Sequence, residues 1–393
     1  MLHSHAVLKV FRDAYLYEVK KLIKVINIIT DTNIGGAGKM LLSFLDNYDK
    51  GKFKLIVIIP YESSLKNELV QRNVEIVEMG GIAEKSFSIK AIREFFLIFK
   101  ELNPHIIHTH ASVSARIAGR IFGNCKIVST RHSVFDVAKY KTKFPMKQIL
   151  GFMNNTLSDV IIAVSPAAKQ NVVDFGTNPQ KVSVVFNGVQ KVERISDEER
   201  KKIRAKYNIA EDDFVCAIIA RLEKVKGHED ILDACKMFEE TDKKIKVLIA
   251  GTGAEEKHLR HKAKTLHLNN CIFTGFVKEI QEIENIMDLQ LNASYGTEAT
   301  SLSLLEGMSI GIPAVVSDFG GNPYVIQSEY NGTVYKKRNV QELYDAVMRI
   351  RADETIYNKM QQNAICCYDE KFTSLVMAQN IEKIYRRLVT NEK

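Results

Sequence analysis

The sequence predicts an α/β protein built from two doubly wound parallel sheets in tandem. Three observations favour this class. The chain has 393 residues, more than one ordinary domain holds. Short apolar runs rich in β-branched residues alternate with longer amphipathic runs, as expected of a parallel sheet covered by helices on both faces. The alternation breaks near residue 190 and restarts, so we expect an N-terminal domain over residues 1–189 and a C-terminal domain over residues 190–373.

The elements follow from this alternation. Predicted strands of the first half are residues 22–29, 53–60, 74–79, 105–110, 126–130, 159–165 and 182–188. Residues 88–102 exemplify the helices between them, with apolar side chains at three- and four-residue spacing. The charged segment 190–213 is expected to be a helical hinge. Predicted strands of the second half are residues 214–220, 245–251, 271–276, 289–294, 313–318 and 332–337. An amphipathic helix over about 374–393 can pack back on the first domain. Such sheets hold ligands at the carboxyl ends of their strands, so we expect a central cleft.

The composition is that of a globular protein, with 46% hydrophobic and 26% charged residues. No apolar run approaches the roughly 18 residues that a membrane helix needs. The N-terminus lacks the apolar core and cleavage site of a secretory signal. Residues 1–18 add little to the first strand, and we hypothesise that they are a loose arm or precede the native start. Six cysteines show no metal-ligand spacing, which favours a reducing cytoplasm.

Positive charge is concentrated in the first half. Residues 1–190 carry 25 Lys and Arg against 15 Asp and Glu, whereas residues 191–393 carry 30 against 32. A basic surface of this kind can meet nucleic acid, an anionic membrane or an anionic substrate. The alternative is a solubility bias without a partner.

The segment NIGGAGKM, residues 33–40, follows the first strand and opens a helix. A P-loop would need glycine where Asn33 stands and a hydroxyl where Met40 stands, and a dinucleotide loop would need glycine at Leu41. Both nucleotide motifs therefore fail at chemically necessary positions. Two interpretations of the segment remain. Either its glycines let the backbone of a helix N-terminus approach a phosphate or another polar group, or the segment is a tight strand-to-helix turn without a ligand.

The segment EATSLSLLE places Glu298 and Glu306 around the start of a predicted helix that Ser301 or Ser303 can cap. Two carboxylates then flank amides suited to an anion. The carboxylates would repel a phosphate, but they can accept hydrogen bonds from hydroxyls on either side of it. A nucleotide diphosphate sugar has this layout, with ribose hydroxyls and sugar hydroxyls on the two sides of its phosphates. The alternative is that Ser303 and Glu306 form an S-x-x-E capping box with no ligand.

Two cations follow the first strand of the second half. Arg221 and Lys226 in ARLEKVKG offer a planar fork and a point charge, which both suit phosphate oxygens. By the crevice rule they face the same cleft as the 298–306 segment. The alternative is that they are ordinary surface charges.

These motifs resemble a known family. ARLEKVKG, IAGTG, FTGFV and the segment from Glu298 to Gly321 resemble the C-terminal half of the family 4 retaining glycosyltransferases of GT-B architecture. That family carries an E-x7-E motif after an R-x4-K pair. In the first half GGAGK, IIHTHAS, STRHSV and VVFNGV fit the same family. The resemblance extends from about residue 22 onward. Tyr324 departs from it, because the family often has glutamate there, and we assign this position no role.

The resemblance implies roles for the donor site. Arg221 and Lys226 would hold the diphosphate and offset the charge that develops as it leaves. Glu306 would bind the ribose hydroxyls and Glu298 the hydroxyls of the donor sugar. His132 would bond a sugar hydroxyl and so assist catalysis. The remaining expected donor contacts, many through backbone groups, are Gly35, Gly36, Phe276, Val277, Thr300, Ser301, Leu302 and Ser303.

The resemblance also implies the reaction. We expect retention by same-face attack, in which the departing phosphate takes the acceptor's proton and Glu298 orients the sugar. Double displacement through a protein nucleophile is the alternative. We see no D-x-D motif, so we expect no metal and no other cofactor. The donor is expected to be a nucleotide sugar, most simply UDP-linked.

The expected acceptor is a glycan or a lipid-linked sugar in cell-envelope or capsular polysaccharide synthesis. The stretch KYKTKFPMKQILGFM, residues 139–153, is basic and aromatic and can lean on an anionic membrane. We therefore expect a cytoplasmic protein with peripheral membrane contact and no nucleic-acid partner. The alternatives are another GT-B enzyme such as an epimerase or phosphorylase, a P-loop-like ATPase using residues 34–40, and a non-catalytic nucleotide-sugar sensor.

Overall fold

The structure is a computed structural model that describes residues 22–134 and 142–390. Residues 1–18 and the start of the basic stretch, residues 139–141, lie outside the described residues. The described chain forms two compact units. The first contains residues up to Ser129, Leu157–Asp159 and residues from Glu382 onward; the second contains the rest. None of the described helices is long and apolar enough to cross a membrane.

A seven-stranded sheet forms in the first half of the chain, with order β3-β2-β1-β4-β5-β6-β7. Its strands confirm all seven predictions: β1 (Ile23–Ile29), β2 (Phe53–Pro60), β3 (Glu75–Met79), β4 (Ile106–His110), β5 (Lys126–Arg131), β6 (Val160–Ala163) and β7 (Val182–Val184). The interior strand β1 pairs in parallel with β2 and with β4, where Val25 lies opposite Leu55 and Ile106. The order reverses between β1 and β4, which makes the carboxyl ends of these strands a topological switch point.

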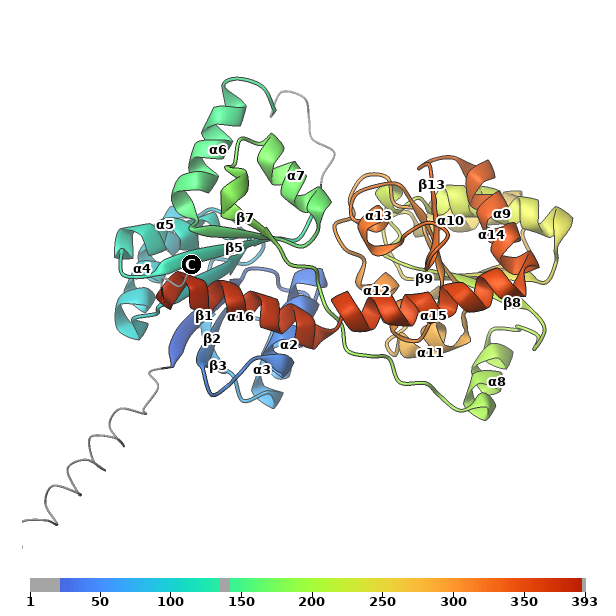
Figure 1. Ribbon diagram of the computed structural model, residues 1–393, viewed down its shortest axis with the longest axis horizontal. Helices are drawn as coiled ribbons and strands as arrows, with labels where there is room; N and C mark the ends of the chain where they lie inside the picture. Colours follow the sequence, from blue (N-terminus) through green and yellow to red (C-terminus); the bar gives the residue numbers. More distant parts are fainter. Residues whose placement is uncertain (1–21, 135–141, 391–393) are drawn as a thin grey trace, which may run out of the picture. The chain divides into compact units, whose positions relative to one another are not determined.

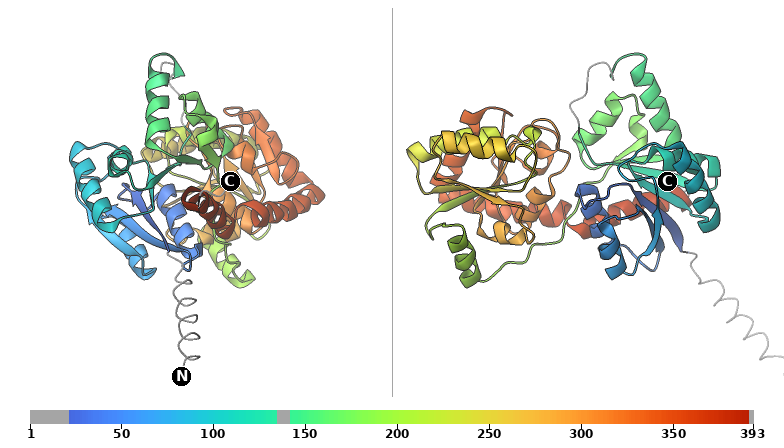
Figure 2. Two further views of the ribbon diagram at one scale, coloured as in Figure 1. Left: turned by 60° about the vertical axis from the view of Figure 1, so that its left-hand side comes forward. Right: turned by 180° about the vertical axis from the view of Figure 1, so that it is seen from behind.

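Helices alternate along the chain with the strands of the first sheet (Figure 1 and Figure 2). They are α2 (Gly36–Asn47), α3 (Leu65–Gln71), α4 (Ile89–Leu102), α5 (Val113–Phe122), α6 (Met146–Leu157) and α7 (Pro166–Asp174). Ser88 caps the start of α4 by accepting the backbone N–H of Ala91. On one face of the sheet, Phe95 and Phe99 of α4 are buried in one cluster with Ile26 of β1. The pattern that predicted this helix therefore marks the side that packs on the sheet.

The other face of the same strands holds the end of the C-terminal helix α16 (Ser374–Thr390). Tyr385 is fully buried there, with its ring edge-on to Phe44 and Phe53 at centroid distances of 6.0 and 5.8 Å. Its hydroxyl lies 2.6 Å from Nδ1 of His108 on β4. The end of α16 thus belongs to the core of the first unit.

The charged segment after β7 contains the expected helix, α8 (Asp197–Lys206). Ser196 and Glu199 form a capping box at its start. Arg204 near its end is buried, and its guanidinium donates to the carbonyl oxygens of Ala210 and Asp213 at 2.8 and 2.6 Å. This buried cation fixes the turn that leads into the next sheet.

The second sheet has six strands in the order β10-β9-β8-β11-β12-β13, and all five neighbouring pairs are parallel. Its strands confirm the six predictions: β8 (Phe214–Ile219), β9 (Ile245–Ala250), β10 (Cys271–Gly275), β11 (Leu289–Asn292), β12 (Ala314–Ser317) and β13 (Gly332–Tyr335). Its switch point lies between β8 and β11. The helices that cover it are α9 (His228–Thr241), α10 (Glu256–Thr265), α11 (Gln281–Ile286), α12 (Leu302–Ser309), α13 (Asn322–Val325), α14 (Val340–Ala352) and α15 (Glu354–Lys371).

The predicted fold class is confirmed, because both halves form doubly wound parallel sheets. The first sheet ends at Val184 and the second begins at Phe214. A domain boundary near residue 190 stays a prediction.

Candidate functional site

The loops after β8 and β11 are packed against each other at the switch point of the second sheet. The backbone N–H of Tyr295 donates to the Val225 carbonyl oxygen over 2.9 Å. Gly227 has a φ of +74°, and a Cβ there would lie 2.1 Å from the carbonyl oxygen of Ala293. Only glycine permits this close backbone approach. The sequence thereby brings the R-x4-K loop beside the loop that leads to Glu298.

Lys226 and Glu298, which are 72 residues apart in sequence, form an ion pair at this place. The ammonium lies 2.9 Å from Oε2 of Glu298, and the side chains are only 15% and 9% exposed. Lys226 also donates to the carbonyl oxygen of Thr297 at 3.1 Å. Oε2 of Glu298 further accepts the Ser294 hydroxyl at 3.2 Å and the Asn292 side-chain amide at 3.4 Å. The pair is thus held in one geometry by several donors.

Arg221 is placed differently. It lies two residues after the end of β8, its side chain is 75% exposed, and its guanidinium lies 2.8 Å from a carboxylate oxygen of Glu223. A pair this exposed contributes little to stability. Arg221 can therefore leave Glu223 for another anion at small cost.

Helix α12 begins at Leu302, with Ser301 at its N-cap position. Among the described residues the Ser301 side chain makes no capping hydrogen bond to the helix. Ser303 is the second helical residue and Glu306 the fifth, so the capping-box interpretation of this pair is wrong: a capping box needs the serine before the helix. The half-buried Glu306 instead lies one turn inside α12.

The hydroxyls around the start of α12 are bonded within the protein. Thr300 is buried and donates to the Val164 carbonyl oxygen over 2.6 Å. The hydroxyls of Ser301 and Ser303 lie 3.0 Å apart, and Ser303 also donates to the Ile219 carbonyl oxygen at 3.3 Å. The groups of this helix start that suit an anion are therefore its backbone amides.

Sequence reasoning missed the structural part of the loop after β12. The N–H of Gly321 donates to the carbonyl oxygen of Glu298 at 3.0 Å. A Cβ on Gly320 would lie 2.0 Å from that oxygen, and one on Gly321 would lie 1.6 Å from the carbonyl oxygen of Ala299. The adjacent glycines Gly320 and Gly321 could have indicated this close approach of two backbone segments. They let this loop buttress the segment that carries Glu298.

Two further sets of expected donor contacts lie elsewhere. After β10, Phe276 is 77% exposed and Val277 packs partly on the core of the second unit. In the first unit, Gly35 is the N-cap of α2 and Gly36 its first residue, with open space around both. Met40 is buried on the inner face of α2.

Family models match most of the chain. Residues 34–191 match the model described as Glycosyltransferase Family 4, and residues 199–365 match the model described as Glycosyl transferases group 1. The chain belongs to glycosyltransferase family 4. The second model spans the R-x4-K and E-x7-E motifs, so the resemblance inferred from these motifs is confirmed.

Curated relatives of this glycosyltransferase have low sequence identity to it, but the similarity extends over most of each chain. It is 26% identical over 299 residues to N-acetyl-alpha-D-glucosaminyl L-malate synthase of Bacillus anthracis, covering 74% of this chain and 77% of the relative. It is 23% identical over 314 residues to the Escherichia coli UDP-Gal:alpha-D-GlcNAc-diphosphoundecaprenol alpha-1,3-galactosyltransferase, covering 77% and 81%.

Solved structures share the fold. Anabaena HepE in complex with UDP superposes with a TM-score of 0.80 at 19% identity, covering 92% of this chain and 99% of HepE. A glycosyltransferase from Rickettsia africae gives a TM-score of 0.80 at 18% identity, covering 95% and 100%. The expected GT-B architecture is thus confirmed.

Two further residues singled out in the sequence are His132 and Tyr324. His132 directly follows β5, is half-buried, and belongs to the same compact unit as Glu298. Tyr324 in α13 is 47% exposed and lines a pocket that Asn171 and Asp318 also line. The expected role of His132 stays a prediction.

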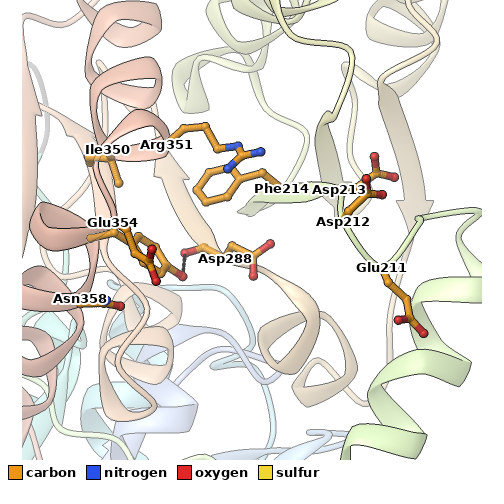
Figure 3. Close-up of a pocket in the computed structure, with 10 residues that line it drawn as sticks. Glu211, Asp212, Asp213, Phe214, Asp288, Ile350, Arg351, Glu354 and Asn358 are labelled. Carbon is orange, nitrogen blue, oxygen red and sulfur yellow. Dashed lines mark hydrogen bonds between the residues drawn. The ribbon is translucent and has the colours of Figure 1, made fainter.

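A separate acidic pocket opens at the amino ends of β8 and β11, the opposite edge of the second sheet. Figure 3 shows Glu211, Asp212 and Asp213 on one side and the guanidinium of Arg351 over the ring of Phe214. Salt bridges to Lys201 and Lys244 occupy the first two acids. Across residues 22–134 and 142–390, no group of three or more His, Cys, Asp or Glu side chains could hold a metal ion. This pocket lies at the edge of the sheet opposite the Lys226–Glu298 pair, whereas doubly wound sheets bind ligands at the carboxyl ends of their strands.

Proposed function

We propose that this enzyme is a retaining, metal-independent glycosyltransferase that transfers a sugar from a UDP-sugar to a glycan or lipid-linked acceptor. The observation that carries the proposal is the Lys226–Glu298 pair, held beside the uncapped start of α12 at the β8/β11 switch point. A cation, a carboxylate and helix amides in one crevice match the phosphates and hydroxyls of a nucleotide sugar.

The donor contacts follow from this arrangement. Lys226 turns from Glu298 to the diphosphate, where Arg221 joins it after leaving Glu223. The amides at the start of α12 donate to phosphate oxygens. Glu298, released from Lys226, accepts hydrogen bonds from the sugar, and Glu306 accepts them from the ribose. Phe276 and Val277 complete the donor contacts of the second unit, and the expected contacts of Gly35 and Gly36 stay a prediction.

The chemistry needs no protein nucleophile. The bond between the anomeric carbon and the phosphate oxygen breaks while the acceptor hydroxyl attacks the same face. The acceptor's proton passes to the departing phosphate. Negative charge develops on the diphosphate as it leaves. Lys226 and Arg221 stabilise this transition state more strongly than they stabilise the bound donor, and this difference accelerates the reaction. His132 holds a hydroxyl of the reacting sugar.

The relatives support the substrate class. The solved HepE complex contains UDP, and the Escherichia coli relative is named for a UDP-galactose donor and a diphosphoundecaprenol-linked acceptor. We therefore place this enzyme in cell-envelope or capsular polysaccharide synthesis.

The proposal is tested by incubating the protein with a panel of nucleotide sugars, with and without lipid-linked and glycan acceptors, in buffer with EDTA. We expect UDP release that an acceptor accelerates and a product with the donor's anomeric configuration by NMR. Lys226→Ala should lower kcat/KM by roughly 10²-fold or more, the scale for losing one transition-state donor. Lys224→Ala removes an exposed lysine from the same turn and should change little. Inverted product, or equal activity of both variants, would refute the proposal.

We also propose that helix α6 and the residues just before it touch an anionic membrane. Phe144, Ile149 and Phe152 are 81%, 50% and 71% exposed, and Lys143 and Lys147 lie among them. Apolar side chains between lysines suit an interface of acyl chains and anionic headgroups. Phe152→Ser should weaken sedimentation with phosphatidylglycerol vesicles at low salt, whereas Phe87→Ser, 56% exposed in the native protein, should not. Binding that salt does not weaken would contradict the idea.

A further inference from the structure

Arg338 occupies a backbone conformation that its side chain must help to maintain. It lies in the turn after β13, which the N–H of Asn339 closes by donating to the Lys336 carbonyl oxygen at 3.0 Å. Its φ is +66°. This third position of a turn normally takes glycine or asparagine when φ is positive. A long side chain is strained in this conformation, so the contacts of Arg338 offset that strain.

Arg338 has two partners in the second unit. Its guanidinium carbon lies 4.6 Å from the ring centroid of Tyr295, within cation–π distance. Its Nη1 lies 3.5 Å from Oδ1 of Asp230, whose side chain is only 6% exposed. Among the described residues, the other oxygen of Asp230 has no hydrogen-bond partner. A buried carboxylate with few donors depends strongly on the cations near it, and Arg338 forms an ion pair with Asp230.

One partner lies in a loop that builds the donor site, and the other lies at the start of the helix that follows the other loop. Tyr295 lies three residues before Glu298, and its N–H is bonded to Val225 next to Lys226. Asp230 lies four residues after Lys226, in the first turn of α9, and its N–H donates to the carbonyl oxygen of Gly227 at 3.0 Å. One guanidinium therefore touches the continuation of the loop after β8 and the start of the loop after β11.

We propose that Arg338 is a positioning residue for the donor site, clamping Tyr295 and Asp230 so that Lys226 and Glu298 keep their separation. The inference rests on the proposed function for its catalytic consequence. Arg338 touches neither Lys226 nor Glu298, so it acts through the two loops. Displacements of about 1 Å in a reacting geometry can cost about 10²-fold in rate. A flat guanidinium can stack and pair at once, which lysine cannot.

The test uses Arg338→Gly, because glycine suits the positive φ and keeps the turn without the guanidinium. We expect a melting temperature within a few degrees of wild type, kcat lowered about 10-fold or more, and donor KM changed by less than about 3-fold. Arg338→Lys should recover only part of kcat. Tyr295→Leu should reproduce the loss, and the double variant should be no worse than either single variant, because both break one clamp. Arg349→Ala, which breaks the surface pair with Glu329, is the matched control and should keep wild-type kcat.

A second readout does not need activity. Hydrogen exchange followed by mass spectrometry should be faster in segments 222–230 and 293–298 of Arg338→Gly, and unchanged in β8 and β9. Unchanged exchange in the loops would overturn the clamp. Faster exchange with wild-type kcat would overturn its positioning role. A wild-type protein inactive on every nucleotide sugar would refute the proposed function instead, and exchange would still decide the clamp.

Discussion

At the scale of single residues, Lys226 and Glu298 carry the most information. Each side chain is nearly buried, and a buried charge is tolerated only when it is paired. A purely structural site of this size would be served as well by apolar packing. An ion pair after the end of β8 instead offers two opposite charges, which suits the phosphates and hydroxyls of the ligand we propose.

The first prediction separates stability from function at this pair. Lys226→Met leaves the Glu298 carboxylate buried without its cation, and we expect the free energy of unfolding to fall by roughly 3 kcal/mol. The double variant Lys226→Met with Glu298→Gln removes both charges and should recover most of that stability but no transferase activity. Urea denaturation and UDP release measure the two effects. If the double variant regains activity, the pair is structural.

A second residue-scale prediction concerns acid stability. His228 is 1% exposed, and neither ring nitrogen has a hydrogen-bond partner among the described residues. Burial, with a smaller effect of the Lys226 charge, lowers the pKa of His228 to about 4. In the unfolded chain a histidine pKa is about 6.5. Between these values only the unfolded state binds the proton, so this contribution to stability is present above about pH 6.5 and is lost as the pH falls toward 4.

His228→Leu should therefore reduce the loss of unfolding free energy between pH 7 and pH 5, by about 2 kcal/mol at most. Urea denaturation at the two pH values measures it. His261→Leu, an exposed histidine of α10, should leave the difference unchanged. Equal acid sensitivity of wild type and His228→Leu would show that His228 is not kept neutral by burial.

At the scale of elements, the end of α16 packs on the first unit through a buried polar contact of Tyr385 inside an apolar interface. Tyr385→Phe keeps the ring packing on Phe44 and Phe53 but leaves Nδ1 of His108 without the hydroxyl at 2.6 Å. We expect a loss of about 1–3 kcal/mol in unfolding free energy by urea denaturation. Tyr330→Phe, at a 41% exposed tyrosine, is the control. A neutral Tyr385→Phe would mean that the hydroxyl bond adds nothing.

The strands could be predicted because they are short apolar runs, most of them buried on both faces, and helix starts such as that of α4 carry a serine cap. The first residue of α12 could not be predicted, because Ser301 and Ser303 both suit an N-cap position and tertiary contacts decide between them. The contact of Lys226 with Glu298 was not readable from spacing either. Only the resemblance placed these two residues in one site, and nothing indicated that they pair with each other.

At the scale of the whole molecule, the family and the crevice geometry lead to a prediction about metal. If lysine and arginine replace a metal on the diphosphate, UDP should stabilise the protein equally in EDTA and in magnesium. At a UDP concentration of about 100 times Kd the gain is about 2.7 kcal/mol, seen as a rise in melting temperature. Lys226→Met should abolish that rise, whereas Lys224→Met should retain it. Stabilisation that appears only with magnesium would contradict metal independence while leaving the glycosyltransferase assignment intact, because that assignment rests on the family match and not on the charge that faces the diphosphate.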